Sequence, residues 1–375
     1  MTTWADWNFD GQPWTVGIEE EVMLVSPETW LPASRCEDVL AAAPAHLARS
    51  ARAETHGSAL ELATAPHATV GAAIAELTEL RERLVGTLAS LGLRAAVSGT
   101  HPLARWEDVE VSPGARYQFL HASMRELARR EPTFGLHVHV AVPDPEAALR
   151  ALNALRLQLP LLLALSANSP FWQGRDSGLA SARTPAFQAF PRTGVPRRFD
   201  HYAHYVEAVD VLLRCDAIPE PTFLWWDARL QPRFGTLEVR IMDAQTRVED
   251  TAALAALVQC LVRHYALGPQ LEPTAADAPE VVDENRFIAA RDGMDAAFVD
   301  PPAWGRRAVG DVLSGQLTAC AEHARALDCT QELAQVPLLA ESPGAARQRA
   351  AAARAGTLEG LLAALSDAFA APVPA

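Results

Sequence analysis

Several predicted strands carry charged or imidazole side chains on one face and aliphatic side chains on the other. Successive side chains of a strand point to opposite faces, so residues two apart share a face. The pairs that share a face are Glu19 and Glu21 in Trp14–Val25, His137 and His139 in Thr133–Val142, and Glu238 and Arg240 in Thr236–Asp243. Each pattern alone is also typical of a solvated face, of two ordinary histidines or of a cross-strand ion pair. Together they predict a sheet with an aliphatic core face and an acidic face, and Glu20 falls on the core face.

Two more glutamates, Glu54 and Glu61, bracket a segment that continues as another predicted strand. If these strands form one sheet, its polar face gathers several carboxylates, whose like charges repel at short range. Hard divalent cations would stabilise such a face, and oxygen ligands favour Mg²⁺ or Mn²⁺ over zinc. A carboxylate floor that holds such ions is suited to binding the phosphates of a nucleotide.

The order of the predicted elements favours the α+β class. The strands Thr222–Leu230 and Thr236–Asp243 are expected to pair as an antiparallel hairpin. A parallel doubly wound sheet is disfavoured, because GxGxxG and a regular strand–helix alternation are both missing from the sequence. Helices are predicted at 70–91, 113–130, 144–166, 200–215, 251–267, 285–297, 303–327 and 345–369. We predict one catalytic domain over residues 1–375, with the helical C-terminal part, about 249–375, packed on the sheet.

All 32 basic residues are arginine, and the chain contains no lysine. This excludes a Schiff-base lysine and a P-loop lysine, so a nucleotide phosphate would have to be held by arginine, backbone amides or metal ions. With 46 acidic residues the net charge is -14, which is the wrong sign for a surface that follows nucleic-acid phosphates. We therefore expect small-molecule substrates and no nucleic-acid partner.

Cysteine usage and hydropathy point to the cytoplasm. The five cysteines are odd in number and include no CxxC pair, which argues against a disulfide scaffold or a zinc ribbon. The N-terminus lacks the basic start and apolar run of a signal peptide. The most apolar stretch, Leu157–Ala167, is too short to span a membrane and contains Pro160. We expect no membrane partner, and a homodimer would be compatible with the sequence.

Eight ordered motifs, which run from about Trp14 to about Arg291, resemble the bacterial carboxylate–amine ligase family, also described as glutamate–cysteine ligase type 2. The motifs are WTVGIEEEVMLV, GSALELAT, SGTHP, PGARYQFL, FGLHVHVAVPD, ANSPFWQGRDSGLASART, TLEVRIMDAQT and ENRFIAARDG. The resemblance implies a glutamine-synthetase-like fold, in which a curved, mainly antiparallel sheet flanked by helices forms a funnel that holds ATP and divalent metals. It also implies that a carboxylate and an amine are joined at the expense of ATP. Glutamate and cysteine are the substrates that this resemblance suggests.

The resemblance also implies roles for individual residues. The residues that correspond to metal-binding positions are Glu19, Glu21, Glu61, His137 and Glu238, with Glu54 at the spacing of a further acidic ligand. Arg240 corresponds to the arginine expected near the γ-phosphate, and we predict Arg240 and Glu238 as catalytic residues. In the loop after Asn168, Arg175 and Arg183 are candidate clamps for a phosphate or a carboxylate because of their two-pronged geometry. A solvated basic loop is the alternative for these two arginines.

Two other functions remain open at this level. A binuclear metallohydrolase could use His137 and His139 with His201, His204 and His264, but such sites usually need more imidazoles for zinc, and this sequence offers mostly glutamates. A catalytically silent relative that still binds nucleotide would retain the same acidic residues. ATP-dependent phosphate release that requires Mg²⁺ and an amine would favour the ligase over both.

Overall fold

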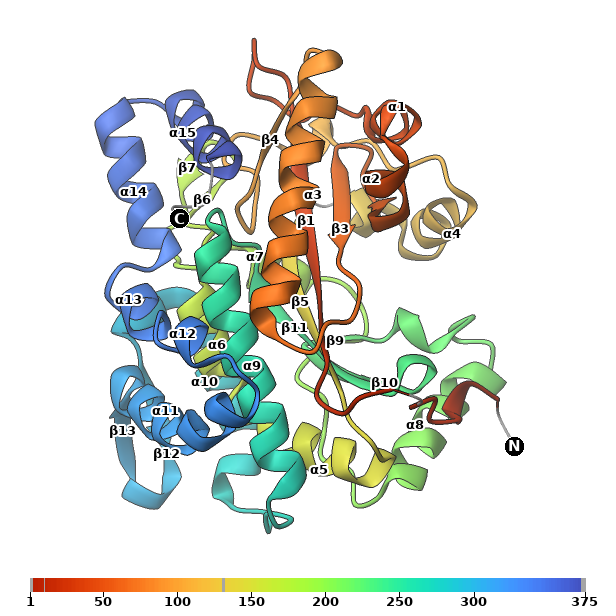
Figure 1. Ribbon diagram of the computed structural model, residues 1–375, viewed down its shortest axis with the longest axis vertical. Helices are drawn as coiled ribbons and strands as arrows, with labels where there is room; N and C mark the ends of the chain where they lie inside the picture. Colours follow the sequence, from red (N-terminus) through yellow and green to blue (C-terminus); the bar gives the residue numbers. More distant parts are fainter. Residues whose placement is uncertain (1–2, 10, 130–131, 372–375) are drawn as a thin grey trace.

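A seven-stranded sheet forms the centre of the molecule (Figure 1). The computed structural model describes residues 3–9, 11–129 and 132–371. The strand order of the sheet is β10-β11-β5-β1-β3-β2, and β4 pairs with the C-terminal end of β1. The bounds are β1 Val16–Val25, β2 Ala51–Ala53, β3 Ala59–Ala63, β4 Arg94–Ala96, β5 Gly135–Ala141, β10 Ala228–Gln231 and β11 Thr236–Asp243. All of its strand pairs are antiparallel. The predicted α+β class with a mainly antiparallel sheet is therefore confirmed.

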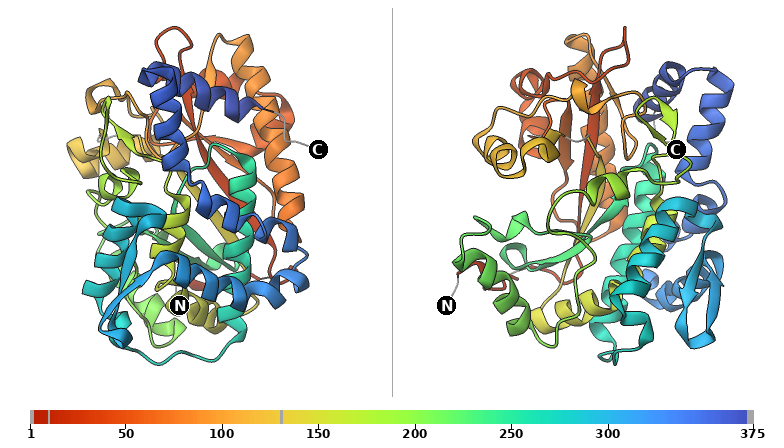
Figure 2. Two further views of the ribbon diagram at one scale, coloured as in Figure 1. Left: turned by 90° about the vertical axis from the view of Figure 1, so that its left-hand side faces the viewer. Right: turned by 180° about the vertical axis from the view of Figure 1, so that it is seen from behind.

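Helices cover the aliphatic face of this sheet. In Figure 1, α3 and α9 lie in front of the strands, and α9 separates the sheet from α11, α12 and α13. Seen from behind in Figure 2, the C-terminal helices, coloured blue, lie along the right-hand edge of the molecule. The longer helices are α3 Val70–Ser90, α4 Ala115–Met124, α5 Pro145–Leu155, α6 Leu159–Ser166, α8 Tyr202–Arg214, α9 Val248–Leu267, α10 Pro279–Asp292, α11 Val309–Ala326, α14 Gly344–Ala355 and α15 Leu358–Ala370. The division into one catalytic domain with a helical C-terminal part stays a prediction.

The remaining elements are short. The helices among them are α1 Cys36–Ala42, α2 Ala45–Ser50, α7 Arg183–Phe187, α12 Thr330–Leu333 and α13 Val336–Glu341. The described residues also form three two-stranded pairs: β6 Phe171–Trp172 with β7 Arg175–Asp176, β8 Thr193–Gly194 with β9 Trp225–Trp226, and β12 Ala297–Asp300 with β13 Gly305–Ala308. No single helix in the described part of the chain is both long and apolar enough to cross a membrane, although α5 and α6 pass that test jointly as a bent pair.

Glu20 lies on the core face of β1, as the alternation predicted. Its carboxylate is fully buried and accepts two hydrogen bonds from the guanidinium of Arg81 on α3, one of them from Nε at 2.8 Å. Arg81 also donates to the backbone carbonyls of Gln245 and Thr246 after β11. A buried charge needs a partner of this kind because desolvation is costly. The pair therefore ties α3 to β1 behind the polar face of the sheet.

Several predicted elements differ in the structure. The helix predicted over 345–369 is two helices, α14 and α15, and the helix predicted over 285–297 is α10, which ends at Asp292. The helix predicted over 144–166 is two helices, α5 and α6, inclined by 65° to each other, because Pro160 lacks the amide that would continue the hydrogen bonds of α5. The strand predicted at Thr222–Leu230 is a 3-10 turn at Pro221–Phe223 followed by the short strands β9 and β10. The helix predicted from Ala303 begins at Val309, since residues 297–308 form the β12–β13 hairpin.

We expect Asp144→Ala to lower the free energy of unfolding by about 1 kcal/mol. Asp144 is the N-cap of α5, and its carboxylate accepts from the amides of Glu146 at 3.0 Å and Ala147 at 3.1 Å. Alanine leaves both amides without this acceptor. Urea unfolding measures the change, and Asp144→Asn should retain most of the stability because its side-chain oxygen still accepts. Equal losses in both variants would contradict the capping role.

Candidate active site

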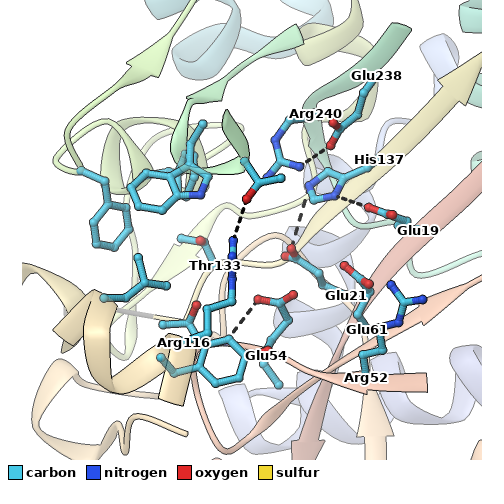
Figure 3. A pocket seen from close by; sticks show the side chains of 18 of the residues that line it. Glu19, Glu21, Arg52, Glu54, Glu61, Arg116, Thr133, His137, Glu238 and Arg240 are labelled. Atoms are coloured by element: carbon cyan, nitrogen blue, oxygen red, sulfur yellow. Dashed lines mark hydrogen bonds and ion pairs between the residues drawn. The ribbon is translucent and has the colours of Figure 1, made fainter. Parts of the chain in front are cut away.

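A cavity of about 470 Å³ lies on the polar face of the sheet. Its floor consists of side chains from β1, β3, β5 and β11, and its walls come from α4, α7 and the segment before β10 (Figure 3). The predicted residues that line it are Glu19, Glu21, Glu54, Glu61, His137, Arg183, Glu238 and Arg240. Aromatic side chains of Tyr117, Phe187, Phe190 and Trp225 form part of the walls. Residues that are far apart in the sequence thus converge on one cavity.

Strand register brings these side chains together. Glu19 lies opposite His137 across β1 and β5, and Glu21 lies opposite Glu61 across β1 and β3. Glu238 lies opposite His139 across β11 and β5. Side chains directly opposite each other in antiparallel strands have Cβ atoms about 4.5–5.5 Å apart. The antiparallel pairing of four strands therefore builds a continuous row of carboxylates and imidazoles.

His137 is shared by two groups of side chains that could hold metal ions. The first group is Glu19, His137 and Glu238, and the second is Glu21, Glu61 and His137. Within each group the ligand atoms lie within 4.8 Å of one another. Figure 3 shows Glu19 and Glu21 on either side of the imidazole, with His137 Nδ1 3.2 Å from Glu19 Oε2 and Nε2 3.9 Å from Glu21 Oε1. Glu54 belongs to neither group, although it lines the same cavity.

The carboxylates at the Glu61 end of the cavity repel one another. Burial raises the pKa of Glu54 to about 7, and the nearby charge of Glu21 adds to the effect. Burial also raises the pKa of Glu61 well above its ordinary value, with Glu19, Glu54 and Glu21 contributing in the same direction. A divalent cation would relieve this repulsion. The donor set is rich in oxygen and contains one imidazole, so its chemistry fits Mg²⁺ or Mn²⁺.

Glu238 accepts hydrogen bonds from three side chains at the other end of the row. Arg229 Nε donates to Oε2 at 2.6 Å, Gln231 Nε2 donates to the same oxygen at 2.7 Å, and Arg240 Nη1 donates to Oε1. Burial alone would raise the pKa of Glu238, but the charges of Arg229, Arg240 and His139 lower it well below its ordinary value. Glu238 is therefore ionised and fixed in orientation.

Two residues of this cluster, Arg229 and Gln231, were not singled out from the sequence, whereas His139 was considered only as a possible ligand of a metallohydrolase. His139 Nε2 lies 3.4 Å from Glu19 Oε1. Burial lowers the pKa of His139, but Glu19 and Glu238 raise it above its ordinary value overall. The alternation of His137 and His139 was a usable signal for His139. Arg229 faces Glu238 only through the β10–β11 register, which composition cannot reveal.

The two loop arginines lie in different places. Arg183 is buried beside the cavity, and its guanidinium donates to the backbone carbonyls of Ile241 at 3.1 Å and Arg240 at 3.2 Å. Arg175 is exposed on the two-residue strand β7 and pairs across that hairpin with Trp172. Arg175 is not among the described residues that line the cavity, because the β6–β7 hairpin carries it outward.

The histidines that a binuclear metallohydrolase would need are not brought together. His201 caps α8 and lies beside the ring of His204, while His264 Nδ1 lies 3.1 Å from His323 Nε2 between α9 and α11. None of these four lines the cavity in the described part of the chain. The His137–His139 strand is therefore not joined by the three histidines that a metallohydrolase would add.

Comparisons with known proteins identify the family. The model of glutamate–cysteine ligase family 2 matches residues 15–368. A Rubrobacter xylanophilus protein named "Putative glutamate--cysteine ligase 2-1" is 40% identical over 337 residues, which cover 90% of this chain and 89% of that protein. A Herpetosiphon aurantiacus protein named "Putative glutamate--cysteine ligase 2" is 40% identical and covers 79% of this chain and 76% of its own.

Solved structures share the fold at low sequence identity. The glutamate–cysteine ligase gshA of Francisella tularensis, solved in complex with AMP, superimposes with a TM-score of 0.69 at 14% identity and covers 97% of this chain and 91% of its own. The bifunctional glutathione synthetase of Pasteurella multocida gives 0.68 at 15% identity and covers 95% of this chain, which spans 52% of that enzyme. The fold predicted from the motifs is thereby confirmed, and the chain belongs to glutamate–cysteine ligase family 2.

Proposed function

We propose that this protein is an ATP-dependent carboxylate–amine ligase that forms an amide bond through an acyl phosphate. The observation that carries the proposal is the pair of metal-ligand groups that share His137 in one cavity, next to Arg240. The family supports the reaction class. The chemistry needs no covalent nucleophile from the protein, which agrees with a cavity lined by carboxylates, imidazoles and guanidinium groups.

The reaction that we propose has two steps. The carboxylate oxygen of the acid attacks the γ-phosphorus of ATP, and the bond between that phosphorus and the bridging oxygen of ADP breaks. The amine nitrogen then attacks the activated carbonyl, loses a proton and expels inorganic phosphate. Holding the reactants in line accounts for much of the rate acceleration in such reactions.

The residues of the cavity would divide these tasks. Glu19, Glu21, Glu61, His137 and Glu238 would hold Mg²⁺ or Mn²⁺, with Glu54 as a further acidic ligand. Bound divalent ions would neutralise charge on the phosphate oxygens. Arg240 would donate to the transferring phosphoryl group, because its charge is held next to Glu238 at the cavity surface. Buried Arg183 lines the same cavity.

The acid and the amine are the finer part of the proposal. Glutamate as the acid and cysteine as the amine follow from the family and from the names of its relatives. ATP is the proposed nucleotide, which the AMP complex of the Francisella tularensis enzyme supports through its fold. The cytoplasmic location and the homodimer stay predictions.

We expect ATP with Mg²⁺ to raise the melting temperature of the protein, since a ligand that binds only the folded state stabilises it by mass action, by about 2.7 kcal/mol at a concentration of 100 Kd. Phosphate release should then depend on both an acid and an amine. A screen of amino acids in pairs, with mass detection of the product, measures this. Stabilisation without phosphate release in any pair would indicate a silent nucleotide-binding relative. The absence of both stabilisation and phosphate release would refute the proposal.

A further inference from the structure

Strand β11 contains a β-bulge next to the metal-ligand groups. Val239 lies opposite Val138 on β5 and Met242 lies opposite Leu136, with a shift in register between them. Arg240 and Ile241 are therefore both matched by His137 alone, which is the two-against-one count of a bulge. Such bulges redirect side chains and are frequent next to active sites.

The bulge decides which side chains of β11 reach the cavity. In an uninterrupted strand, Met242 would share a face with Glu238 and Arg240. Because the bulge inserts one residue, Val239 and Met242 both lie in the core, and both are fully buried there. Glu238 and Arg240 remain at the cavity. Arg240 shares the face of Glu238 by alternation, but it is also one of the two bulge residues, so the direction of its side chain depends on how the bulge is held.

Two residues supply hydrogen bonds to the backbone of the bulge. The amides of Arg240 and Ile241 both donate to the carbonyl of Asp227, at 2.8 and 3.1 Å. The carbonyls of the same two residues accept from Nη2 and Nη1 of Arg183, at 3.2 and 3.1 Å. The side chain of Asp227 is itself fixed by Arg286, whose Nε donates to it at 2.6 Å. A planar guanidinium can bridge two neighbouring carbonyls, whereas an ammonium is a single point of charge.

The surroundings of Arg183 are shaped to hold its guanidinium in this place. A methyl group on Gly135 would clash with Nη2 of Arg183 and would come within 2.9 Å of His137 Nε2. The largest negative charge that acts on Arg183 is that of Asp243, with further contributions from Glu21 and Asp227. Asp243 is buried and accepts from Ser169 Oγ at 2.6 Å and Ser181 Oγ at 3.0 Å. Gly135 and Asp243, which have no ligand-binding role in the proposed mechanism, therefore both help to fix the side chain of Arg183.

We infer that Arg183 is a positioning residue that holds the β11 bulge and thereby aims Arg240 at the transferring phosphoryl group. The inference rests on the proposed function and refines one sequence prediction, since Arg183 would act through Arg240 instead of clamping ATP itself. The bidentate contact to the two bulge carbonyls is the observation that distinguishes these roles. Its Nε has no hydrogen-bond partner among the described residues, so the hydrogen bonds that fix the guanidinium are those to β11.

A double-mutant cycle between Arg183→Ala and Arg240→Ala tests the inference, with kcat and the KM for ATP measured for each variant. We expect Arg183→Ala alone to lower kcat by about 100-fold and to change the KM for ATP by less than about threefold. In the Arg240→Ala background the same substitution should change kcat by less than about threefold, because the group that it positions is gone. Losses that multiply in the double variant would overturn the inference.

Two further variants support the test. Arg183→Lys keeps the charge and replaces Arg183→Ala if the alanine variant does not fold. We expect it to lower kcat by at least about tenfold, and we expect this loss to disappear in the Arg240→Ala background. Arg156→Lys is the matched control, since Arg156 is also buried and donates to a backbone carbonyl, that of Pro196 at 3.0 Å, away from the cavity. Its effect should be similar in both backgrounds.

A crystal structure of Arg183→Ala provides a readout that does not depend on activity. We expect Arg240 to leave its contact with Glu238, or the register of β11 to shift between Val239 and Met242. An unchanged bulge with Arg240 in place would overturn the inference even if the wild type proved inactive. An inactive wild type with a displaced Arg240 would refute the proposed function and leave the positioning role supported.

Discussion

Glu21→Gln is expected to lower the rate of ATP-dependent amide formation by on the order of 10²- to 10³-fold, while the protein stays folded. The substitution removes one charge from a proposed metal ligand and leaves the apolar packing intact. The amide oxygen of glutamine can still accept from the backbone amide of Gly135, which donates to Glu21 Oε2 at 2.5 Å. Steady-state phosphate release and urea unfolding measure the two effects.

Glu20→Gln at the neighbouring position is the matched control, and we expect it to lower stability but not kcat. Glu20 lies on the core face and pairs with buried Arg81, so its loss leaves an uncompensated charge and should cost about 3–5 kcal/mol in the free energy of unfolding. The folded fraction should keep its kcat, because Glu20 does not line the cavity. The proposed metal site would be contradicted if Glu21→Gln kept full activity. It would also be contradicted if folded Glu20→Gln lost as much kcat as Glu21→Gln.

Arg240→Lys is expected to lower kcat by about 10²-fold or more, although the positive charge is retained. Arg240 Nη1 donates to Glu238, and Arg240 lines the cavity, where an ammonium cannot reproduce a planar two-pronged contact. The stability of the protein should change little, since lysine still balances the charge of Glu238. Single-turnover phosphate transfer, followed with labelled ATP, measures the affected step directly.

Arg175→Lys serves as the control for this substitution. Arg175 was a candidate phosphate clamp from the sequence, but its side chain is exposed on β7 outside the cavity. We expect its kcat and KM for ATP to remain within about twofold of the wild type, in line with the small effects of surface substitutions. Equal losses in Arg175→Lys and Arg240→Lys would show that the loop closes over the nucleotide and would change the assignment.

Much of the candidate site could be predicted because strand alternation is a local property. Glu19 and Glu21 were assigned to one face and Glu20 to the other, and the structure places Glu20 in the core and the other two at the cavity. The ordered motifs identified the family, which the family model and the relatives confirm. Element boundaries were less accurate where a proline or a short hairpin interrupts a periodic pattern, as at Pro160 and at residues 297–308.

The sequence by itself determined which side chains share a face and which family the chain belongs to, because a period of two residues and a set of ordered motifs are both encoded within short segments. Only the tertiary structure decided which faces meet. It set Arg229 and Gln231 on Glu238, turned Arg175 outward and placed Arg183 on the β11 bulge. Register, bulges and contacts between distant segments depend on how the whole chain packs, so no local pattern contains them.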